Sequence, residues 1–217
     1  MSWLEAIVLG LTQGLTEFLP VSSSGHLIIV GWLFGWDSPG LAFDAALHLG
    51  TLLAVFVYFW RDLLQMVQAI PTILRKRMAL LGAAGPGEDD DTFYARLAVL
   101  LVIGSIPGGV VGLLGESKID DLFHPTSHQD RAIVAIAILL AVFAVLLWVA
   151  DRVGDERRTL RSVRAPDALI IGVAQAIALM PGTSRSGVTL TAGLFRGFQR
   201  ADAARFSFLL GIPLIAA

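Results

Sequence analysis

Two short segments of the chain combine hydroxyl, amide and ionisable side chains with helix-breaking residues. The first segment surrounds Pro20 and contributes Gln13, Glu17, Ser22, Ser23, Ser24 and His26. The second segment follows Pro181 and contributes Thr183, Ser184, Arg185 and Ser186. Free backbone N–H groups at the start of a helix favour an anion, and a guanidinium matches phosphate oxygens in a planar fork. These residue types therefore predict a phosphate site with acid–base groups beside it.

Phosphoryl transfer suits these groups best, because it needs neutralised phosphate charge and an activated nucleophile. Arg185 and the two helix starts would hold the phosphate, with further contacts from the hydroxyls of Ser22, Ser24, Thr183, Ser184 and Ser186. Ser23 or His26 would attack phosphorus or activate water, and the residues leave this choice open. Glu17, one helical turn after Gln13, would orient His26 or hold a divalent cation.

Each of these residues also has a purely structural interpretation. The serines could only cap a helix, Glu17 could be a buried acid paired with Arg185, and His26 could lie at the membrane interface. However, an ionisable residue inside a membrane is costly and is by default a functional candidate. Asp44 and His48 are weaker candidates, because they are expected near the outer end of a span.

The composition indicates a membrane protein. Of 217 residues, 55% are hydrophobic and 16% are charged, against about 25% charged residues in a typical soluble domain. The net charge of −2 lacks the basic excess of a nucleic-acid-binding protein, so no nucleic-acid partner is expected. The absence of cysteine excludes disulfides and cysteine nucleophiles.

Three apolar stretches are predicted to cross the membrane as helices, namely residues 41–60, 97–115 and 132–150. The segments between them differ in charge: residues 61–77 hold four basic residues, residues 152–164 hold five and residues 116–130 hold one. Because basic segments stay cytoplasmic, the first two are expected inside and the third outside.

The two polar segments are copies of one repeat. At a constant offset of 162 residues, the identical pairs include Gln13/Gln175, Ser22/Ser184, Ser24/Ser186 and Gly25/Gly187. An odd number of predicted spans separates the copies, so they enter the membrane from opposite sides. This is an inverted-topology repeat, in which broken helices gather polar groups at the midplane.

The fold predicted from these patterns is an all-α integral membrane protein with one membrane domain over residues 1–217. Its first repeat covers about residues 1–115 and its second about residues 130–217. Each copy is expected to form a re-entrant helix–loop–helix, and the two loops are expected to meet near the bilayer midplane. Because the chain ends inside an apolar run, a truncated second repeat is expected.

At these residues the sequence resembles the undecaprenyl-diphosphate phosphatase family, also called the bacitracin-resistance protein family. The first motif runs from Gln13 through Glu17 to the stretch Pro-Val-Ser-Ser-Ser-Gly-His that ends at His26. The second is Pro-Gly-Thr-Ser-Arg-Ser-Gly, residues 181–187. Both motifs are long, and the resemblance extends along the whole chain.

The resemblance implies an integral-membrane hydrolase that converts undecaprenyl diphosphate to undecaprenyl phosphate, the lipid carrier of cell-wall precursors, and so confers bacitracin resistance. It places catalytic roles on Glu17, Ser23, His26 and Arg185, and it implies a divalent cation, Mg²⁺ or Ca²⁺. Glu17 is the expected metal ligand, with Gln13 nearby. Gln13 departs from the glutamate of many family members, which removes one ligand and leaves the metal geometry open.

The resemblance further implies a multi-pass protein of the bacterial inner membrane whose catalytic cleft opens to the outer side. The expected partners are the lipid substrate, the bilayer and a second copy of the chain in a homodimer. The competing interpretation is a transporter or flippase for a phosphorylated lipid, since inverted repeats are frequent in transporters. Ser23 beside His26 favours the enzyme, because transport alone needs no nucleophile beside a base. A structural scaffold has no use for Glu17, His26 and Arg185 at broken helices.

Overall fold

The computed structural model of the chain describes every residue except 37–39, 83, 86, 124–128, 181, 216 and 217. The described residues form ten α-helices and two short 3₁₀ helices, as the predicted all-α class requires. The α-helices are α1 (Trp3–Phe18), α2 (Ser23–Phe34), α3 (Leu41–Tyr58), α4 (Trp60–Gln68), α5 (Ile70–Lys76), α6 (Asp90–Phe123), α7 (Gln129–Val153), α8 (Ala165–Ile177), α9 (Arg185–Phe195) and α10 (Arg200–Ile215). The 3₁₀ helices are η1 (Arg77–Leu81) and η2 (Leu160–Ser162).

Both copies of the repeat fold as a helix, a break and a second helix. The first copy is α1 followed by α2, and the second is α8 followed by α9. Ser2 and Glu5 start α1 with reciprocal side-chain to backbone hydrogen bonds, which satisfy amides that a helix start leaves free. Pro181, predicted to break the second copy, lies outside the described residues.

The predicted spans correspond to helices with different ends. Among the described residues, Asp90–Leu114 is long and apolar enough to cross a membrane. The pair Ala42–Tyr58 and Trp60–Gln68 passes the same test only when taken together, and it bends by 68°. The prediction of a single helix over residues 41–60 is therefore wrong at its end, because α3 stops at Tyr58. The predicted span 132–150 lies within α7, where part of the side chains are outside the described residues.

The segment predicted as an outer loop, residues 116–130, is partly helical. Helix α6 begins at Asp90 and continues to Phe123, well past the predicted end at residue 115. Charged residues 116–121 tolerate a helix as well as a loop, and they carry no proline. The charge pattern therefore indicated which residues leave the apolar span, and it did not reveal that the backbone stays helical.

Helix α6 packs directly along α8, and two glycines permit the close approach. A Cβ on Gly172 would collide with the carbonyl group of Gly104, whose carbon would lie 2.8 Å away. The hydrophobic core gathers around this contact and is continued by side chains of α9 and α10, including Leu97, Leu100, Ile171, Leu194, Phe206 and Leu210. This core fixes the second break in space.

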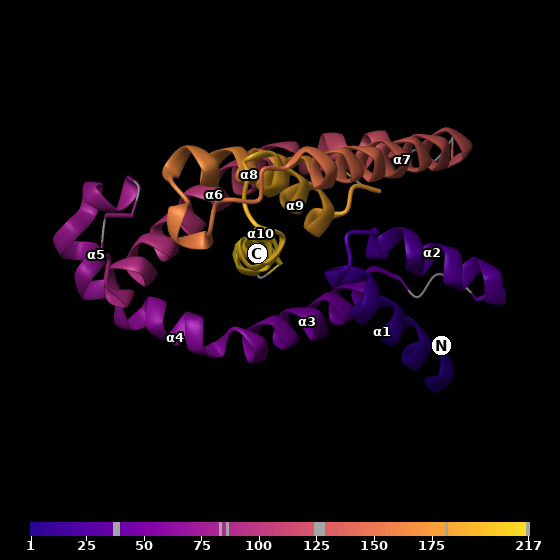
Figure 1. Cartoon of the computed structure of the whole chain (residues 1–217). Coiled ribbons are helices and arrows are strands. Elements are labelled where there is room, and N and C mark those ends of the chain that lie inside the picture. The colour runs from indigo at the N-terminus through magenta and orange to yellow at the C-terminus, as the bar shows by residue number, and fades with distance from the viewer. Residues whose placement is uncertain (37–39, 83, 86, 124–128, 181, 216–217) are drawn as a thin grey trace.

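Helix α10 lies between two groups of helices. Figure 1 views α10 nearly along its axis, with α6, α7, α8 and α9 on one side of it and α3 and α4 on the other. The contacts agree, because α10 packs against α9, α6 and α3. Helices α1 and α2 pack on each other, and α1 also contacts α3. This arrangement brings the end of α1 and the start of α9 to the C-terminal half of α10, at Phe208 and Gly211.

Candidate active site

The two predicted segments meet on the carboxylate of Glu17. Glu17 is the last but one residue of α1, and its side chain is 8% exposed. Its Oε2 accepts hydrogen bonds from Ser23 Oγ at 2.7 Å and from Gln13 Nε2 at 3.2 Å. Its Oε1 accepts from Arg185 Nη2 at 2.7 Å. One carboxylate therefore joins the first copy of the repeat to the second, as the prediction that the two loops meet requires.

A strained turn at Ser22 directs Ser23 towards Glu17. Ser22 has φ of 66° and ψ of 98° and immediately precedes the first residue of α2. A non-glycine residue in such a sparsely populated conformation costs about 1–3 kcal/mol and persists when its surroundings hold it. The turn lets α2 start with Ser23, whose buried hydroxyl points back to α1. Ser22 Oγ lies 3.3 Å from Ser24 Oγ.

Arg185 is fixed by its own helix start and by a glycine opposite. It is the first residue of α9, and the preceding Ser184 caps the helix by accepting from the Gly187 amide at 3.2 Å. Its guanidinium lies against α10 at Gly211, where an added Cβ would coincide with it. A larger residue at this position would force the Arg185 guanidinium to move from its present position beside Glu17.

The remaining hydroxyls of the second segment mainly hold the two breaks in place. Ser186 Oγ donates to the Glu17 carbonyl oxygen at 3.1 Å, which ties α9 to the end of α1. Thr183 Oγ1 donates to the Met180 carbonyl oxygen at 2.5 Å. Ser184 Oγ lies 3.2 Å from Ser186 Oγ. These groups shape the wall of the site, and a bound phosphate would have to compete with their present acceptors.

A cavity of about 320 Å³ opens beside the Glu17–Arg185 pair. Its walls contain all five residues predicted as further phosphate contacts, together with Glu17, Ser23 and Arg185. The others are Thr16, His48, Ala178, Leu179, Leu214 and Ile215. The residues thus bring hydroxyls, a carboxylate and a guanidinium to one hollow, which is the arrangement that phosphate binding and transfer need.

Comparison with known proteins identifies the same family as the two motifs that line this cavity. The sequence model of the bacitracin resistance protein BacA matches residues 6–217. The chain belongs to the BacA family. It is 51% identical, over 98% of its length and 73% of the relative, to the undecaprenyl-diphosphatase of Thermomicrobium roseum. It is 47% identical, over all of its length and 74% of the relative, to that of Moorella thermoacetica, and 48% identical, over 99% and 74%, to that of Desulforudis audaxviator.

In this BacA-family chain, the two histidines near the site occupy different positions from those expected. His26 Nδ1 bonds the Ser22 carbonyl oxygen at 2.9 Å, and His26 is not among the residues that line the cavity. His48, ranked as the weaker candidate, does line it, with Nε2 3.9 Å from Glu17 Oε2. Its Nδ1 bonds the Asp44 carbonyl oxygen at 2.8 Å. The spacing of Asp44 and His48 was the signal, but only the packing of α3 against α1 turns His48 towards Glu17.

Sequence reasoning missed the contribution of α10. Gly211, Leu214 and Ile215 belong to residues 206–217, a stretch of the sequence without any ionisable residue, so nothing in the local pattern separates them from ordinary span residues. The local signal is that Gly211 has no side chain, and its meaning depends on Arg185, a residue of another helix.

The oxygen atoms of the site suit a divalent cation whose remaining ligands are supplied by substrate and water. Within the part of the chain that the structure describes, no three His, Asp or Glu side chains gather to hold a metal. Among the described residues, however, Gln13 Oε1 is buried without a hydrogen-bond partner, while the amide nitrogen of Gln13 is held by Glu17. A carboxylate with an adjacent free carbonyl oxygen suits Mg²⁺ or Ca²⁺, since Mg²⁺ is usually bound through one or two carboxylates and phosphate oxygens.

Proposed function

We propose that the cavity beside Glu17 hydrolyses undecaprenyl diphosphate to undecaprenyl phosphate and inorganic phosphate. The single observation that carries this is the carboxylate of Glu17, which accepts from a serine hydroxyl and from a guanidinium at 2.7 Å each. A base beside a hydroxyl is the arrangement of an activated nucleophile, and a guanidinium beside both neutralises phosphate charge. The names of the relatives supply the substrate, whose hydrolysis regenerates the lipid carrier for peptidoglycan synthesis.

Ser23 is the nucleophile that the geometry favours. Its Oγ attacks the terminal phosphorus while Glu17 Oε2 takes its proton. The bond between that phosphorus and the bridging oxygen breaks, and the electron pair leaves with undecaprenyl phosphate. Water then attacks the phosphorus of the phosphoserine, the bond between phosphorus and Ser23 Oγ breaks, and Glu17 returns its proton to Ser23 Oγ while the protons of the water leave with inorganic phosphate.

His26 is the alternative nucleophile. Its Nδ1 is held by the Ser22 carbonyl oxygen, so its other ring nitrogen would have to turn into the cavity to reach phosphorus. In the preferred assignment, His26 instead stabilises the strained turn at Ser22 and thereby the direction of Ser23.

Arg185 has two partners in succession. Without substrate its guanidinium pairs with Glu17, and the pair is largely buried, with side-chain exposures of 14% and 8%. A diphosphate in the cavity competes for the guanidinium, which frees Glu17 Oε1 and makes the carboxylate a better proton acceptor. Ser22, Ser24, Thr183, Ser184 and Ser186 would add hydroxyl contacts to the phosphate oxygens.

A divalent cation, Mg²⁺ or Ca²⁺, is part of the proposal. Glu17 and Gln13 Oε1 would hold it from the protein side. When bound, it would neutralise diphosphate charge.

The arrangement in the bilayer is proposed from the charge pattern and the repeat. The basic segments 61–77 and 152–164 lie in the cytoplasm, and the two broken copies enter the bacterial inner membrane from opposite sides as re-entrant loops. The single membrane domain thus contains repeats over about residues 1–115 and 130–217, and its catalytic cleft opens to the outer side. A homodimer is proposed on the resemblance alone.

Phosphate release from undecaprenyl diphosphate by the purified chain in detergent tests the function. Activity with Mg²⁺ should disappear with a chelator, and Arg185→Ala should lower kcat by about 100–1000-fold, the usual loss for one charge-stabilising donor. Arg157→Ala is the control, since Arg157 is exposed and pairs only loosely with Asp155 at 4.0 Å. Near-normal turnover in Arg185→Ala would refute the proposed site. Substrate binding without release would instead support transport.

A further inference from the structure

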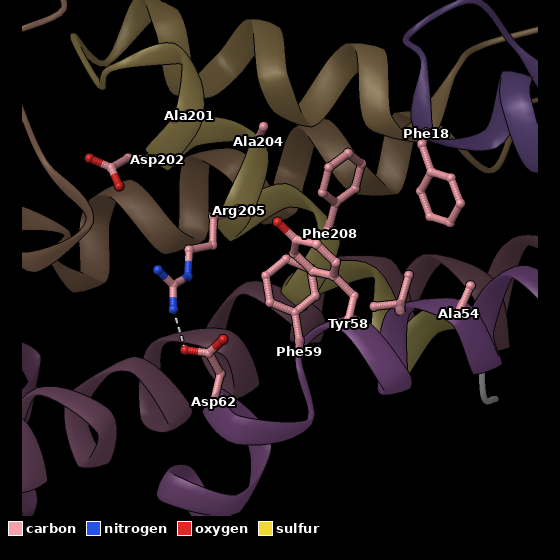
Figure 2. Close-up of a pocket in the computed structure, with 11 residues that line it drawn as sticks. Phe18, Ala54, Tyr58, Phe59, Asp62, Ala201, Asp202, Ala204, Arg205 and Phe208 are labelled. Carbon is pink, nitrogen blue, oxygen red and sulfur yellow. Dashed lines mark hydrogen bonds and ion pairs between the residues drawn. The ribbon is translucent and has the colours of Figure 1, made fainter.

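A second and larger cavity lies along the same helices as the active site. It has a volume of about 730 Å³ and is formed by α3 and the start of α4 on one side and α10 on the other. Figure 2 shows aromatic side chains around it, namely Phe18, Tyr58, Phe59 and Phe208, with Asp62 facing Arg205 at one end. We call it the α3–α10 groove. It plays no part in the chemistry proposed above.

The groove and the active-site cavity are adjacent hollows that lie along two shared helices and have no lining residue in common. On α3, His48 lines the active site and Ala54 lines the groove; on α10, Leu214 lines the active site and Phe208 lines the groove. Both steps are six residues, which is about 9 Å of helix. The two hollows therefore follow each other along the contact between α3 and α10.

The end of α1 stands at the junction between the two hollows. Glu17 faces the active site, and the next residue, Phe18, forms part of the groove wall. Phe18 packs edge-on against Phe208, with ring centroids 5.7 Å apart. A ligand whose charged head occupies the first hollow would thus meet this aromatic pair next.

We propose that the α3–α10 groove binds the isoprene units next to the diphosphate of the substrate. This inference rests on the proposed function, which supplies a ligand with a charged head joined to a long apolar chain. Once the diphosphate is beside Glu17 and Arg185, the chain must leave through an apolar opening that is continuous with the site. The groove begins at Phe18, the residue next to Glu17, and its wall is mostly apolar and includes four aromatic side chains, with Asp62 and Arg205 at one end.

The groove selects by shape rather than by a large gain in affinity. Lipid tails are as apolar as the groove wall, so moving the prenyl chain from bilayer to groove is not driven by the hydrophobic effect. The modest binding free energy comes instead from close packing of the prenyl chain against the aromatic rings. The groove should therefore discriminate between short and long prenyl chains and align the terminal phosphate with Ser23.

A different hollow of about 690 Å³ lies on the other side of α10, lined by Pro20, Val21, Trp148 and Leu190 among others. Its walls come from the first break and from α7, α9 and α10, and none of its residues belongs to α3. It therefore does not continue the active site along the α3–α10 contact. It is the first competing route for the chain, and bulk lipid in the groove is the second.

Filling the groove tests the proposal by kinetics. Ala54 is an exposed residue of α3 on the groove, so Ala54→Phe adds a ring there without disturbing the core. Ala45→Phe is the matched control, because Ala45 is exposed on the same helix about two and a half turns away, on the opposite face. Ala54→Phe should raise KM for farnesyl diphosphate about tenfold and leave kcat much closer to the wild-type value. Tyr58→Ala, which removes an exposed part of the wall, should also lower the preference for the longer chain.

The measured quantity is the ratio of kcat/KM for farnesyl diphosphate to kcat/KM for isopentenyl diphosphate. A ratio that falls in Ala54→Phe and Tyr58→Ala but not in Ala45→Phe supports the groove. An unchanged ratio in both groove variants overturns it while leaving the phosphatase intact. Failure of the proposed function has a different signature: full turnover of both substrates in Arg185→Ala.

Photo-crosslinking tests the same proposal without relying on turnover. The probe is a farnesyl diphosphate analogue with a benzophenone at the tail end, and the labelled peptides are identified by mass spectrometry. Labelling of residues 54–62 and 205–208 that is lost in Arg185→Ala supports the proposal, whereas Ala201 and Ala204 line both hollows and do not discriminate. Labelling at residues 144–151 and 190–194 would assign the tail to the other hollow. Equal labelling by the corresponding farnesol analogue would mean that the groove holds any lipid, and either of these two results overturns the proposal.

Discussion

Gly211→Ala is expected to inactivate the enzyme by displacing Arg185. Helix α10 passes the guanidinium at Gly211, and an added Cβ would lie 2.6 Å from Arg185 Cζ and still nearer to Nη1. The Arg185 side chain is only 14% exposed, so it cannot give way without leaving Glu17. Loss of one preorganised donor at the reacting phosphate lowers kcat by about 100–1000-fold, or about 2.7–4 kcal/mol of transition-state stabilisation.

The same substitution has a smaller effect on folding. Replacing a glycine inside a helix gains about 0.8–1.0 kcal/mol, whereas removing one partner of a buried ion pair costs about 3–5 kcal/mol. The guanidinium is displaced rather than deleted and can reach polar surroundings in the cavity, so the net loss should be below that range. Activity is therefore measured per folded protein, after size-exclusion chromatography. Gly109→Ala in α6 is the control, because a Cβ there would meet no atom of the described residues within 4 Å.

A double mutant separates displacement of Arg185 from a general defect. If Gly211→Ala acts only through the guanidinium, the pair Gly211→Ala with Arg185→Ala should be no less active than Arg185→Ala alone, since the two changes remove one interaction. Wild-type turnover in Gly211→Ala would refute the reasoning, and so would independent losses that multiply in the double mutant.

Three further predictions concern the proposed cation, the buried Arg96 ion pair and the topology. Gln13→Glu should lower the Mg²⁺ concentration for half-maximal activity by about tenfold, because a second carboxylate replaces a neutral oxygen; a higher requirement in a titration of phosphate release would contradict the cation site. Arg96→Met should destabilise the fold by about 3–5 kcal/mol in thermal unfolding, because Arg96 is 2% exposed, holds Glu88 at 2.7 Å and donates to two backbone carbonyls; a loss below about 1 kcal/mol, the value typical of surface pairs, would contradict it. In this cysteine-free chain, Thr159→Cys should react with a membrane-impermeant thiol reagent only in broken cells, since Thr159 belongs to the basic segment; labelling in intact cells would reverse the proposed orientation.

The meeting of the two loops could be predicted because the repeat is visible as identical residues at a constant offset. Ser22/Ser184 and Ser24/Ser186 align at one offset, and both helix starts carry the same chemistry. The sequence could not predict which oxygen of Glu17 receives which donor, because this depends on how α1 and α9 cross. It also could not place His48 in the cavity, since the orientation of α3 against α1 is set by contacts that no local pattern contains.

The helix ends were less predictable than the helices. The bend after Tyr58 lies in an apolar and aromatic run without proline or glycine, so propensity gives no sign of it. Its position follows from tertiary contacts, since Asp62 in α4 bonds both Tyr94 in α6 and Arg205 in α10. Local sequence favours continued helix there, and the polar contacts of α4 redirect the chain.

The repeat also explains why one carboxylate suffices for the whole site. Ser23 and Arg185 occupy equivalent positions of the two copies, at the first residue of α2 and of α9. Each contacts a different oxygen of Glu17 at 2.7 Å. The two copies have thus diverged at this position into a hydroxyl and a cation, which are the two functions that phosphoryl transfer requires beside one base.

The position of the second copy that is equivalent to Glu17 carries no charge. It is Leu179, which also lines the cavity. A second carboxylate there would face the first across a site that must accept an anion, and like charges in a poorly solvated hollow repel strongly. It would also compete with Glu17 for Arg185 and so weaken the positive charge that binds phosphate. A repeat that kept strict symmetry at this pair would therefore be expected to bind a diphosphate less well, and the proposed chemistry depends on the asymmetry between Glu17 and Leu179.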